Sequence, residues 1–384
     1  MIYRKKKNGG EICVFISKIP PSMRQSAHKD ILKFLHEVIP GSSRGQFSRR
    51  ICLMASLVQA CIRNGHCRLE SLSEPTEAYG TDKKSSLLQQ SKRWLANKWT
   101  DWQGFYLPFA QHFLQGLAAK GEVVFVIDGS QTGHANTSLM LSVLCRGFAI
   151  PVAWVVKKGE TGHFPEEMHL DLLRTVAPIC PAGCRLVLLG DGEFDGEGLI
   201  GWCASNNWEF VVRTSSDRLI DFGGETARFD SLCTDRTICF IPGALRLANA
   251  VFWHQKPYKK PLFLLTNLEL GEMACRYYKR RFKIETLFKH LKSAGFYLHK
   301  TRLKCPRKVA NLIIVVAFAF VISFCMGAFL KENVERGTLE TFVRKDRIKK
   351  IDPIAIAQIA ISRNATCALL FFSELSKNFH HVFT

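Results

Sequence analysis

The sequence lacks a metal-binding cysteine pattern. Its 14 cysteines are scattered along 384 residues without a CxxC pair, and the closest spacing, Cys180 to Cys184, has no matching second pair. The cluster of Cys61, His66 and Cys67 is equally isolated. Structural zinc sites use two such pairs, so none is indicated. The cysteines are expected to be buried free thiols in a reducing cytoplasm.

The sequence also lacks internal repeats, low-complexity tracts and a secretory signal. Its start, MIYRKKKNGGEICVF, is basic but has no apolar stretch followed by a small-residue cleavage site. The composition is that of a globular protein, with 47% hydrophobic and 22% charged residues. At this length we expect two or three domains with ample core.

Acidic residues are scarce relative to basic ones. The chain has 53 Lys and Arg but 33 Asp and Glu, which gives a formal net charge of +20 and a pI near 9.5. Such a charge favours a polyanionic partner, which is either a nucleic acid or an anionic membrane surface.

One segment has the length and hydropathy of a membrane span. Residues 309–330 form a run of 22 residues without a charge. The sequence has no second segment of this kind, and Asn311 and Ser323 interrupt the run. A helix that is apolar all round is also typical of the core of a large domain. The two interpretations, membrane anchor and core helix, stay open at this point.

Hydrophobic periodicity predicts two regions that differ in secondary structure. Residues 1–118 are predicted to be mainly helical, with basic residues clustered among the helices, and we expect a helical N-terminal DNA-binding domain there. The helices expected in it are residues 30–38, 47–63, 86–95 and 108–117. Residues 331–384 are the least readable part and are a candidate dimerisation region.

Residues 119–330 are predicted to form an α/β domain in the order three strands, helix, strand, helix, strand. The expected strands are 122–128, 139–147, 148–158, 184–191, 208–214 and 262–268, and the helices are 164–176 and 197–204. Residues 215–261 are expected to be an insert with short strand-like pieces. The second and third strands are expected to pair as a hairpin.

Two aspartates occupy equivalent places in this pattern. Asp128 and Asp191 each end an apolar strand and are followed by glycine. Either one alone is most simply a turn residue. If their strands are neighbours, however, the two carboxylates lie side by side at one end of the sheet. An acid on a helix packed across the sheet would then complete an oxygen-rich site suited to Mg²⁺.

A basic stretch at residues 276–296 supplies such an acid. Tyr278, Arg281, Glu285 and Lys292 lie at offsets of 0, 3, 7 and 14. In one continuous helix these offsets fall within about 60° of one another. A carboxylate flanked by cations suits metal-assisted chemistry on a phosphodiester. The alternative is a solvated amphipathic helix whose basic residues face water.

The spacing Tyr-x2-Arg-x3-Glu-x6-Lys resembles the YREK signature of bacterial insertion-sequence transposases of the DDE class, and the similarity covers about residues 47–330. The resemblance implies an RNase H-like catalytic core with a β-rich insert before the last acid. The 93 residues between Asp191 and Glu285 leave room for that insert. It also implies a cytoplasmic, nucleoid-associated protein without a membrane partner, in which 309–330 is a core helix.

The resemblance further implies a role for each residue of the site. Asp128, Asp191 and Glu285 would bind two Mg²⁺ ions, for which Mn²⁺ can substitute. The resemblance also implies that Tyr278, Arg281 and Lys292 contact phosphates of the transposon end. Lys289 is a further candidate for such a contact. Partners would be the terminal inverted repeats and target DNA, held by a homodimer in a synaptic complex.

In such a family water cleaves the DNA at the element's end, and the freed 3′-OH attacks the opposite strand or the target. Some relatives form a hairpin and flip a base onto a tryptophan of the insert. Trp253 is the only tryptophan in this insert, so it is the candidate DNA contact. Burial in the core is the alternative role for its ring.

One departure from the family pattern concerns the second acid. Asp191 is followed by Gly192, Glu193, Phe194 and Asp195, which shifts the glycine by one position and adds two acids. Asp195 or Glu193 is therefore an alternative to Asp191. Two other functions also stay open: a catalytically inactive DNA-binding remnant of a transposable element, and a membrane-associated protein anchored by 309–330.

Overall fold

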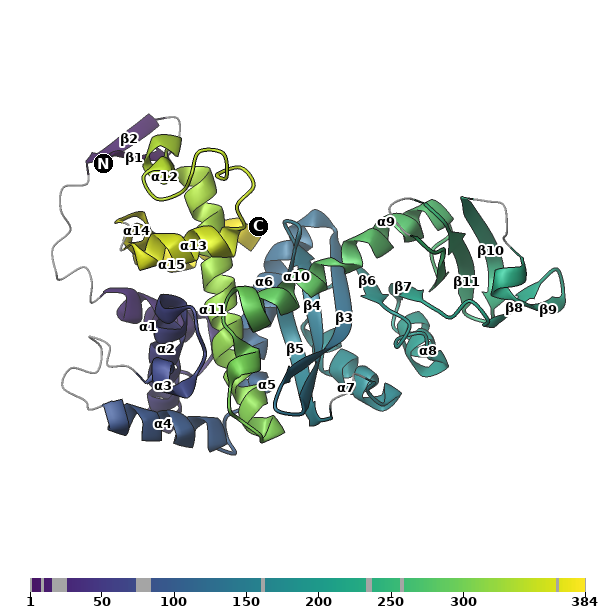
Figure 1. Ribbon diagram of the computed structural model, residues 1–384, viewed down its shortest axis with the longest axis horizontal. Coiled ribbons are helices and arrows are strands. Elements are labelled where there is room, and N and C mark those ends of the chain that lie inside the picture. The colour runs from purple at the N-terminus through teal and green to yellow at the C-terminus, as the bar shows by residue number, and fades with distance from the viewer. Residues whose placement is uncertain are drawn as a thin grey trace. The chain divides into compact units, whose positions relative to one another are not determined.

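The computed structural model describes residues 2–7, 10–15, 26–73, 84–159, 163–232, 237–255, 259–363 and 366–383. The chain divides into two compact units. Unit 1 combines the residues up to Gly116, the short piece Thr132–His134 and the residues from Lys289 on. Unit 2 contains Leu117–Gln131 and Ala135–Phe288. Figure 1 labels their helices and strands.

Among the described residues, unit 2 is built on an eight-stranded mixed sheet in the order β10-β11-β12-β7-β6-β3-β4-β5. Its strands are β3 (Glu122–Gly133, whose last residues belong to unit 1), β4 (Asn136–Cys145), β5 (Phe148–Lys158), β6 (Arg185–Gly190), β7 (Trp208–Arg213), β10 (Ile238–Leu245), β11 (Ala248–Trp253) and β12 (Leu262–Thr266). The chain is thus a mixed α/β protein with a large mixed sheet.

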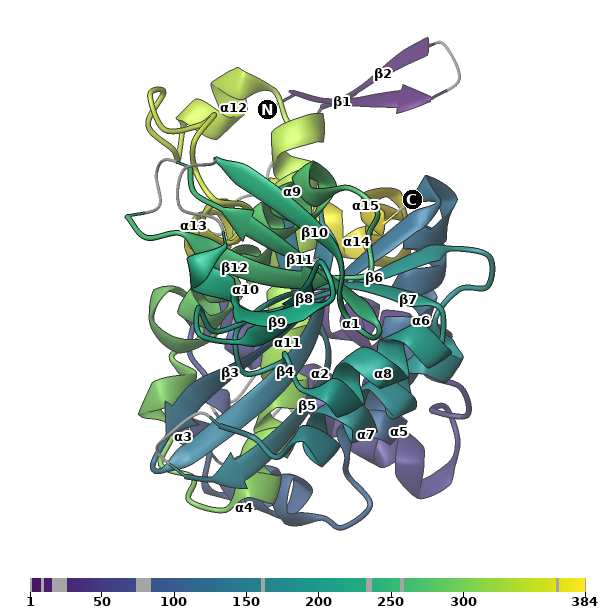
Figure 2. The same ribbon diagram turned by 90° about the vertical axis from the view of Figure 1, so that its right-hand side faces the viewer.

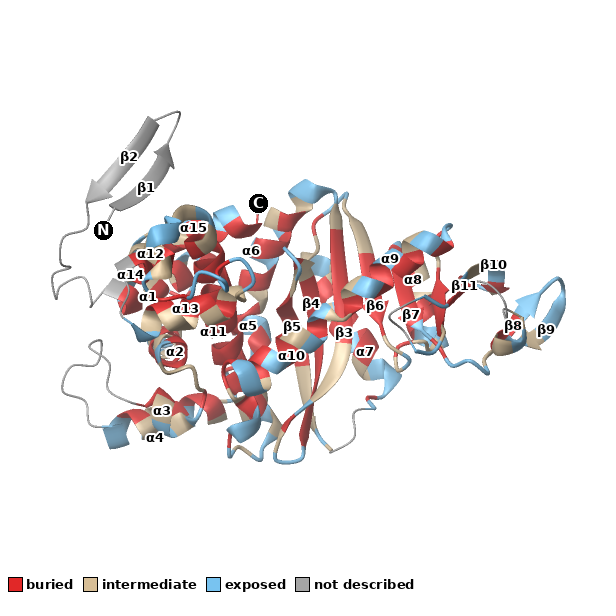
Figure 3. Cartoon of the chain, turned by 45° about the horizontal axis from the view of Figure 1, so that its top comes forward, coloured by how far each residue is buried: buried red, intermediate tan, exposed pale blue. Residues whose placement is uncertain are grey.

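The middle of the sheet is parallel and its flanks are antiparallel. β3 pairs with β6, and β6 with β7, in parallel, and these strands are continuously apolar because both of their faces are covered. Figure 3 shows β3 and β6 as mostly buried. On one flank β4 and β5 form the expected hairpin, closed by Arg146 and Gly147, which both have positive φ. Such a turn matches the twist of paired strands.

The order of elements in this part of unit 2 is the one predicted from periodicity. Helix α7 (Glu166–Val176) follows β5, and helix α8 (Glu197–Ser205) follows β6. The two helices lie side by side (Figure 2). A helix between successive parallel strands is the connection that such pairing requires.

The predicted insert is β-rich and partly joins the main sheet. β8 (Leu219–Phe222) and β9 (Glu225–Arg228) form a separate two-stranded sheet. β10 and β11, by contrast, extend the eight-stranded sheet through β12, which pairs antiparallel with β7. Two strands of the predicted insert, β10 and β11, therefore belong to the same sheet as β3 and β6, the strands that carry the two aspartates.

The expectation of one continuous helix over 276–296 is wrong. Helix α9 (Gly271–Arg281) ends at Phe282, helix α10 (Lys283–Lys289) follows, and His290–Ala294 form a π-helical turn. Each departure from 100° per residue rotates the face that follows it. The four-residue spacing of Arg281 and Glu285 is kept across the break, because Arg281 donates to Glu285, and the role of Lys292 stays a prediction.

Unit 1 is mainly helical. Its helices are α1 (Ser26–Val38), α2 (Gly45–Asn64), α3 (Leu69–Leu72), α4 (Lys84–Ala96), α5 (Trp102–Phe105), α6 (Leu107–Leu117), α11 (Pro306–Asn333), α12 (Arg336–Glu340), α13 (Pro353–Ser362), α14 (Thr366–Ser373) and α15 (Leu375–Phe383). A hairpin of β1 (Ile2–Lys7) and β2 (Gly10–Phe15), which the sequence did not predict, precedes them. The domain boundaries at 118 and 330 stay a prediction.

Helix α11 contains the apolar run and is the centre of unit 1. Its residues 311–330 are buried without exception, and α2, α4, α13 and α15 pack against it. It is long and apolar enough to cross a membrane, yet its most apolar 18 residues are entirely buried by protein. Figure 3 shows the helix as buried along most of its length. This helix is a core helix of unit 1.

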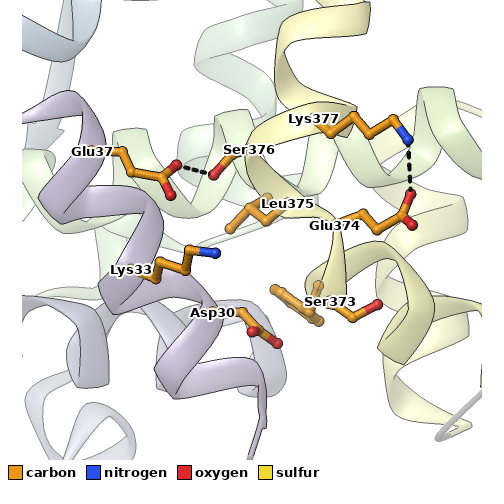
Figure 4. Close-up of a pocket in the computed structure, with 9 residues that line it drawn as sticks. Asp30, Lys33, Glu37, Ser373, Glu374, Leu375, Ser376 and Lys377 are labelled. Atoms are coloured by element: carbon orange, nitrogen blue, oxygen red, sulfur yellow. Dashed lines mark hydrogen bonds and ion pairs between the residues drawn. The ribbon is translucent and has the colours of Figure 1, made fainter.

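The C-terminal helices pack against the first helix. Phe379 of α15 contacts Phe34 of α1 and Phe109 of α6, with ring centroids 5.1 Å apart in both pairs. Beside this cluster a cavity of about 270 Å³ lies between α1 and the α14–α15 junction (Figure 4). Its charges are partly compensated within the cavity, because Ser376 donates to Glu37, and Lys377 lies 3.8 Å from Glu374.

Gly327 is required by the close packing of α11 and α13. A Cβ at this position would lie 1.9 Å from the carbonyl oxygen of Pro353. We predict that Gly327→Ala lowers the free energy of unfolding by about 3 kcal/mol, because backbone cannot move aside cheaply. The matched control is Gly337→Ala in α12, where a Cβ meets nothing within 4 Å. Urea unfolding measures both variants, and equal effects would contradict the packing described.

Candidate active site

Asp128 and Asp191 lie beside each other at the carboxyl edge of two neighbouring parallel strands. Asp128 is in β3, and Asp191 directly follows β6. The register pairs Val126 with Leu189, so two further residues on each strand bring the aspartates opposite each other. Ligand sites of α/β sheets lie beyond this edge. The two strands are therefore neighbours, which is the condition under which the sequence places the two carboxylates side by side.

Helices α9 and α10 bring a cation and a third acid to these aspartates. The Arg281 Nη1 donates to Asp128 Oδ2 at 3.2 Å, and its Nη2 donates to Glu285 Oε1 at 3.1 Å. The Arg281 side chain is 8% exposed, Asp128 is 15% exposed and Glu285 is 57% exposed. One buried guanidinium therefore joins an acid of the sheet to an acid of the helix.

The electrostatics of the site agree with this grouping. Burial and the negative charge of Asp191 raise the pKa of Asp128 from 3.8 to about 6, against the opposing effect of Arg281. Glu285 adds a smaller upward contribution. Burial disfavours the charged Arg281, but Tyr278 and the surrounding carboxylates raise its pKa above the usual value. All three predicted acids thus influence one electrostatic site.

The donor chemistry of the site fits a hard divalent cation. Carboxylate oxygens are the ligands that Mg²⁺ prefers, and a cation would relieve the repulsion that raises the pKa of Asp128. In the described part of the chain, however, no group of three or more His, Cys, Asp or Glu side chains is close enough to hold a metal ion. The Arg281 guanidinium joins Asp128 to Glu285.

Tyr278 and Arg213 flank the acids. Tyr278 of α9 is 1% exposed, and burial raises its pKa, while the charges of Arg281, Arg213 and Asp191 also act on it. Arg213 ends β7, the next strand after β6, in register just beyond the pair Gly190 and Val212. Its side chain is exposed. Sequence reasoning missed Arg213, although a cation at the end of the strand after Asp191 was the signal that could have revealed it.

Glu193, one of the two alternatives to Asp191, turns toward helix α7. The Phe164 amide donates to Glu193 Oε1 at 2.5 Å, and His169 Nε2 lies 3.4 Å from the same oxygen. These contacts lower the pKa of Glu193 despite its partial burial, which acts in the opposite direction. Glu193 thus stabilises the start of α7, where its negative charge is favourable.

Asp195, the other alternative, is held on the far side of the same loop. Thr214 Oγ1 donates to Asp195 Oδ2 at 2.5 Å, and Arg218 Nη1 donates to the same oxygen at 3.0 Å. Phe194, which lies between Glu193 and Asp195 in the sequence, is fully buried. It packs closely on Gly190, because a Cβ added at Gly190 would lie 2.7 Å from the Cβ of Phe194. The loop therefore directs its three acids to three different partners.

Lys289, Lys292 and Trp253 are placed differently from the other predicted DNA contacts. Lys289 ends α10 and Lys292 lies in the π-helical turn, and both belong to unit 1. Trp253, on β11, is fully buried, with the Lys279 ammonium 5.0 Å from the centroid of its ring. In this conformation Trp253 has the core position that was its alternative role, and its contact with DNA stays a prediction.

The comparison with protein families supports one reaction class. The family model described as "Transposase DDE domain" matches residues 165–322, a span that includes Asp191 and Glu285. This match supports a DDE transposase, and proteins with such a domain generally use divalent metal ions. A search of curated proteins found no match.

A search of solved structures found similar chains, among them one in a cryo-EM structure of the piggyBac transposase synaptic complex with hairpin DNA. The two chains share 14% sequence identity with a TM-score of 0.45. The similarity covers 93% of this chain and 82% of that one.

The raised pKa of Asp128 has a measurable effect on stability. Because the folded state binds this proton more tightly than the unfolded state does, ionised Asp128 costs stability above about pH 6, and the cost disappears below about pH 4. We predict that Asp128→Asn changes the free energy of unfolding relative to wild type in a pH-dependent way. The difference between variant and wild type should be more favourable to the variant at pH 7.5 than at pH 4, by up to about 3 kcal/mol. Urea unfolding at both pH values measures this difference, and a pH-independent effect would contradict it.

Proposed function

We propose that the protein is a DNA transposase of the YREK-signature DDE group with an RNase H-like core formed around β3–β7. The observation that carries the proposal is the grouping of Asp128, Asp191 and Glu285 around Arg281, with two of the acids on adjacent parallel strands. The net charge of +20 supports a polyanionic partner. The fold supplies the strand ends, and helices α9 and α10 supply the third acid.

The three carboxylates would hold the catalytic metal. Two Mg²⁺ ions, or Mn²⁺ in their place, would supply activation of the attacking oxygen and stabilisation of the leaving oxygen. Asp128 and Asp191 are held rigidly by the sheet, and Glu285, which is more exposed, approaches from the helix. Such a division suits a site that must admit a DNA strand and then close on it.

The cations around the acids would position the DNA. Arg281 and Arg213 present guanidinium groups near the acids, and guanidinium forms paired hydrogen bonds with phosphate. The buried Tyr278 orients Arg281 by stacking, with the guanidinium carbon 5.6 Å from its ring centroid. We propose that Lys289 and Lys292 bind further phosphates of the transposon end, and that Trp253 reaches a flipped base after a rearrangement of the insert.

The proposed reaction determines which DNA segments and which protein partner the chain must bind. Terminal inverted repeats would be cleaved first, and the freed 3′-OH would then attack the opposite strand or target DNA. Both transposon ends must be held together during these steps, so we propose a homodimer on DNA, in a cytoplasmic, nucleoid-associated protein. Residues 331–384 remain the proposed dimerisation region.

Strand cleavage tests the proposal directly. Duplexes that carry the DNA flanking this gene are incubated with Mg²⁺ and with wild-type protein, Glu285→Gln or Glu272→Gln, and the products are mapped on a denaturing gel. Glu272 is an exposed carboxylate in the first turn of α9 and serves as the matched control. We predict a nick at the element boundary with wild type and the control, and a loss of at least about 10³-fold with Glu285→Gln.

Two outcomes would count against the proposal. DNA binding without cleavage by either the wild type or the control would support the inactive remnant instead. Cleavage that persists undiminished in Glu285→Gln would remove Glu285 from the site.

The same assay separates Asp191 from its neighbour. We predict that Asp191→Asn loses cleavage by at least about 10³-fold, because Asp191 lies next to Asp128. Asp195→Asn is predicted to keep cleavage within about tenfold of wild type, since Asp195 is bound to Thr214 and Arg218. The opposite ranking would assign the second acid to Asp195.

A further inference from the structure

Arg281 makes contacts that a simple DNA-binding arginine does not need. Its two terminal nitrogens bond two different acids, Asp128 at 3.2 Å and Glu285 at 3.1 Å. The side chain is 8% exposed, and its guanidinium carbon lies 4.7 Å from the Phe282 ring centroid and 5.6 Å from that of Tyr278. A guanidinium held in this way is turned toward the acids and away from solvent.

The neighbouring cations have other partners. Arg280 donates to Glu122 at 3.1 Å, and the Lys279 ammonium lies over Trp253. Arg281 is therefore the cation of this helix that compensates the acids. Without it, the largely buried Asp128 would face the negative charges of Asp191 and Glu285 with no compensating cation, and repulsion is costly for a carboxylate that water reaches poorly.

We propose that Arg281 is an internal counter-cation, which holds the acids in the metal-free protein and leaves them when a divalent cation binds. The released guanidinium then becomes available to a phosphate of the DNA. This inference rests on the proposed transposase function and adds a regulatory role for one residue of its site. The site would thereby avoid presenting a free arginine and three bare acids at the same time.

The physical basis of the switch is competition between two cations for the same two carboxylates. A divalent cation needs direct contact with carboxylate oxygens, and Arg281 already bonds one oxygen of each acid that it joins. Two cations on one carboxylate repel each other strongly in a partly buried site. Exchange of one for the other follows, and the freed arginine retains its charge because its pKa lies far above neutrality.

The two possible roles of Arg281, competition with the metal and support of the metal ligands, predict opposite changes in metal affinity when Arg281 is replaced. If Arg281 competes with the metal, its removal tightens metal binding. If Arg281 only positions Asp128 and Glu285 for the metal, its removal weakens binding. A coupling between metal and DNA phosphate also follows, because each ligand favours the state in which Arg281 has left the acids, and such coupling is reciprocal.

Binding of Mn²⁺ to the full chain without DNA distinguishes the two roles. Electron paramagnetic resonance at neutral pH measures free Mn²⁺ with wild type, Arg281→Gln and the matched control Arg280→Gln, and circular dichroism verifies folding. We predict that Arg281→Gln binds Mn²⁺ about tenfold more tightly than wild type, within the usual range for coupled sites. Arg280→Gln should equal wild type, because its partner Glu122 is outside the site.

Equal or weaker Mn²⁺ binding by folded Arg281→Gln would overturn the inference while leaving the proposed function intact. If no variant binds Mn²⁺, or if Asp128→Asn binds it as well as wild type, the proposed metal site itself fails. Should Arg281→Gln not fold, Arg281→Lys replaces it, because lysine keeps the charge but cannot bond both acids in the same planar arrangement. It should bind Mn²⁺ more tightly than wild type, and unchanged binding would contradict the inference.

Fluorescence anisotropy of a labelled duplex supplies a second readout that does not depend on cleavage. Ca²⁺ is predicted to raise the DNA affinity of wild type by about fivefold or more through release of Arg281. The same ion should have no such effect on Arg281→Gln. An equal gain in both proteins would show that the released arginine does not carry the coupling.

Discussion

The ionic contact of Arg281 with Asp128 and Glu285 is the interaction on which the proposed site depends. It joins a residue of the central parallel strands to one on the helices that follow the insert, over more than 150 positions of sequence. Burial of Asp128 beside the negative charges of Asp191 and Glu285 would be strongly unfavourable without this cation. The sheet fixes Asp128 and Asp191, so the position of Glu285 is determined by where its helix can bring a compensating charge.

The loop after β6 contains three acids within five residues, and only Asp191 lies next to Asp128. Gly190 admits the buried Phe194 ring, which fixes the loop on the sheet. Glu193 is then drawn to the Phe164 amide, and Asp195 to Thr214 and Arg218. Since each extra acid has its own donors, neither adds its charge to the pair formed by Asp128 and Asp191.

Much of unit 2 was predictable because strand-forming runs are local signals. The sequence predicted the order of β3–β7 and both strand-end aspartates. It could not predict the break at Phe282 or the π-helical turn, because residues 276–294 contain no Gly or Pro that would mark either one. Arg213 was missed because its position near the acids follows from strand order. The position of Trp253 was left open because a β-rich insert buries tryptophans routinely, whereas the family resemblance implied a contact with DNA.

Iron-mediated backbone cleavage tests most directly whether the three acids form one metal site. Fe²⁺ bound in place of Mg²⁺ and supplied with ascorbate and peroxide produces radicals that cut the chain near the metal, and mass spectrometry locates the cuts. The account predicts cuts close to Asp128, Asp191 and Glu285 together, all suppressed by excess Mg²⁺. Cuts near one of them alone, or cuts that Mg²⁺ does not suppress, would contradict it.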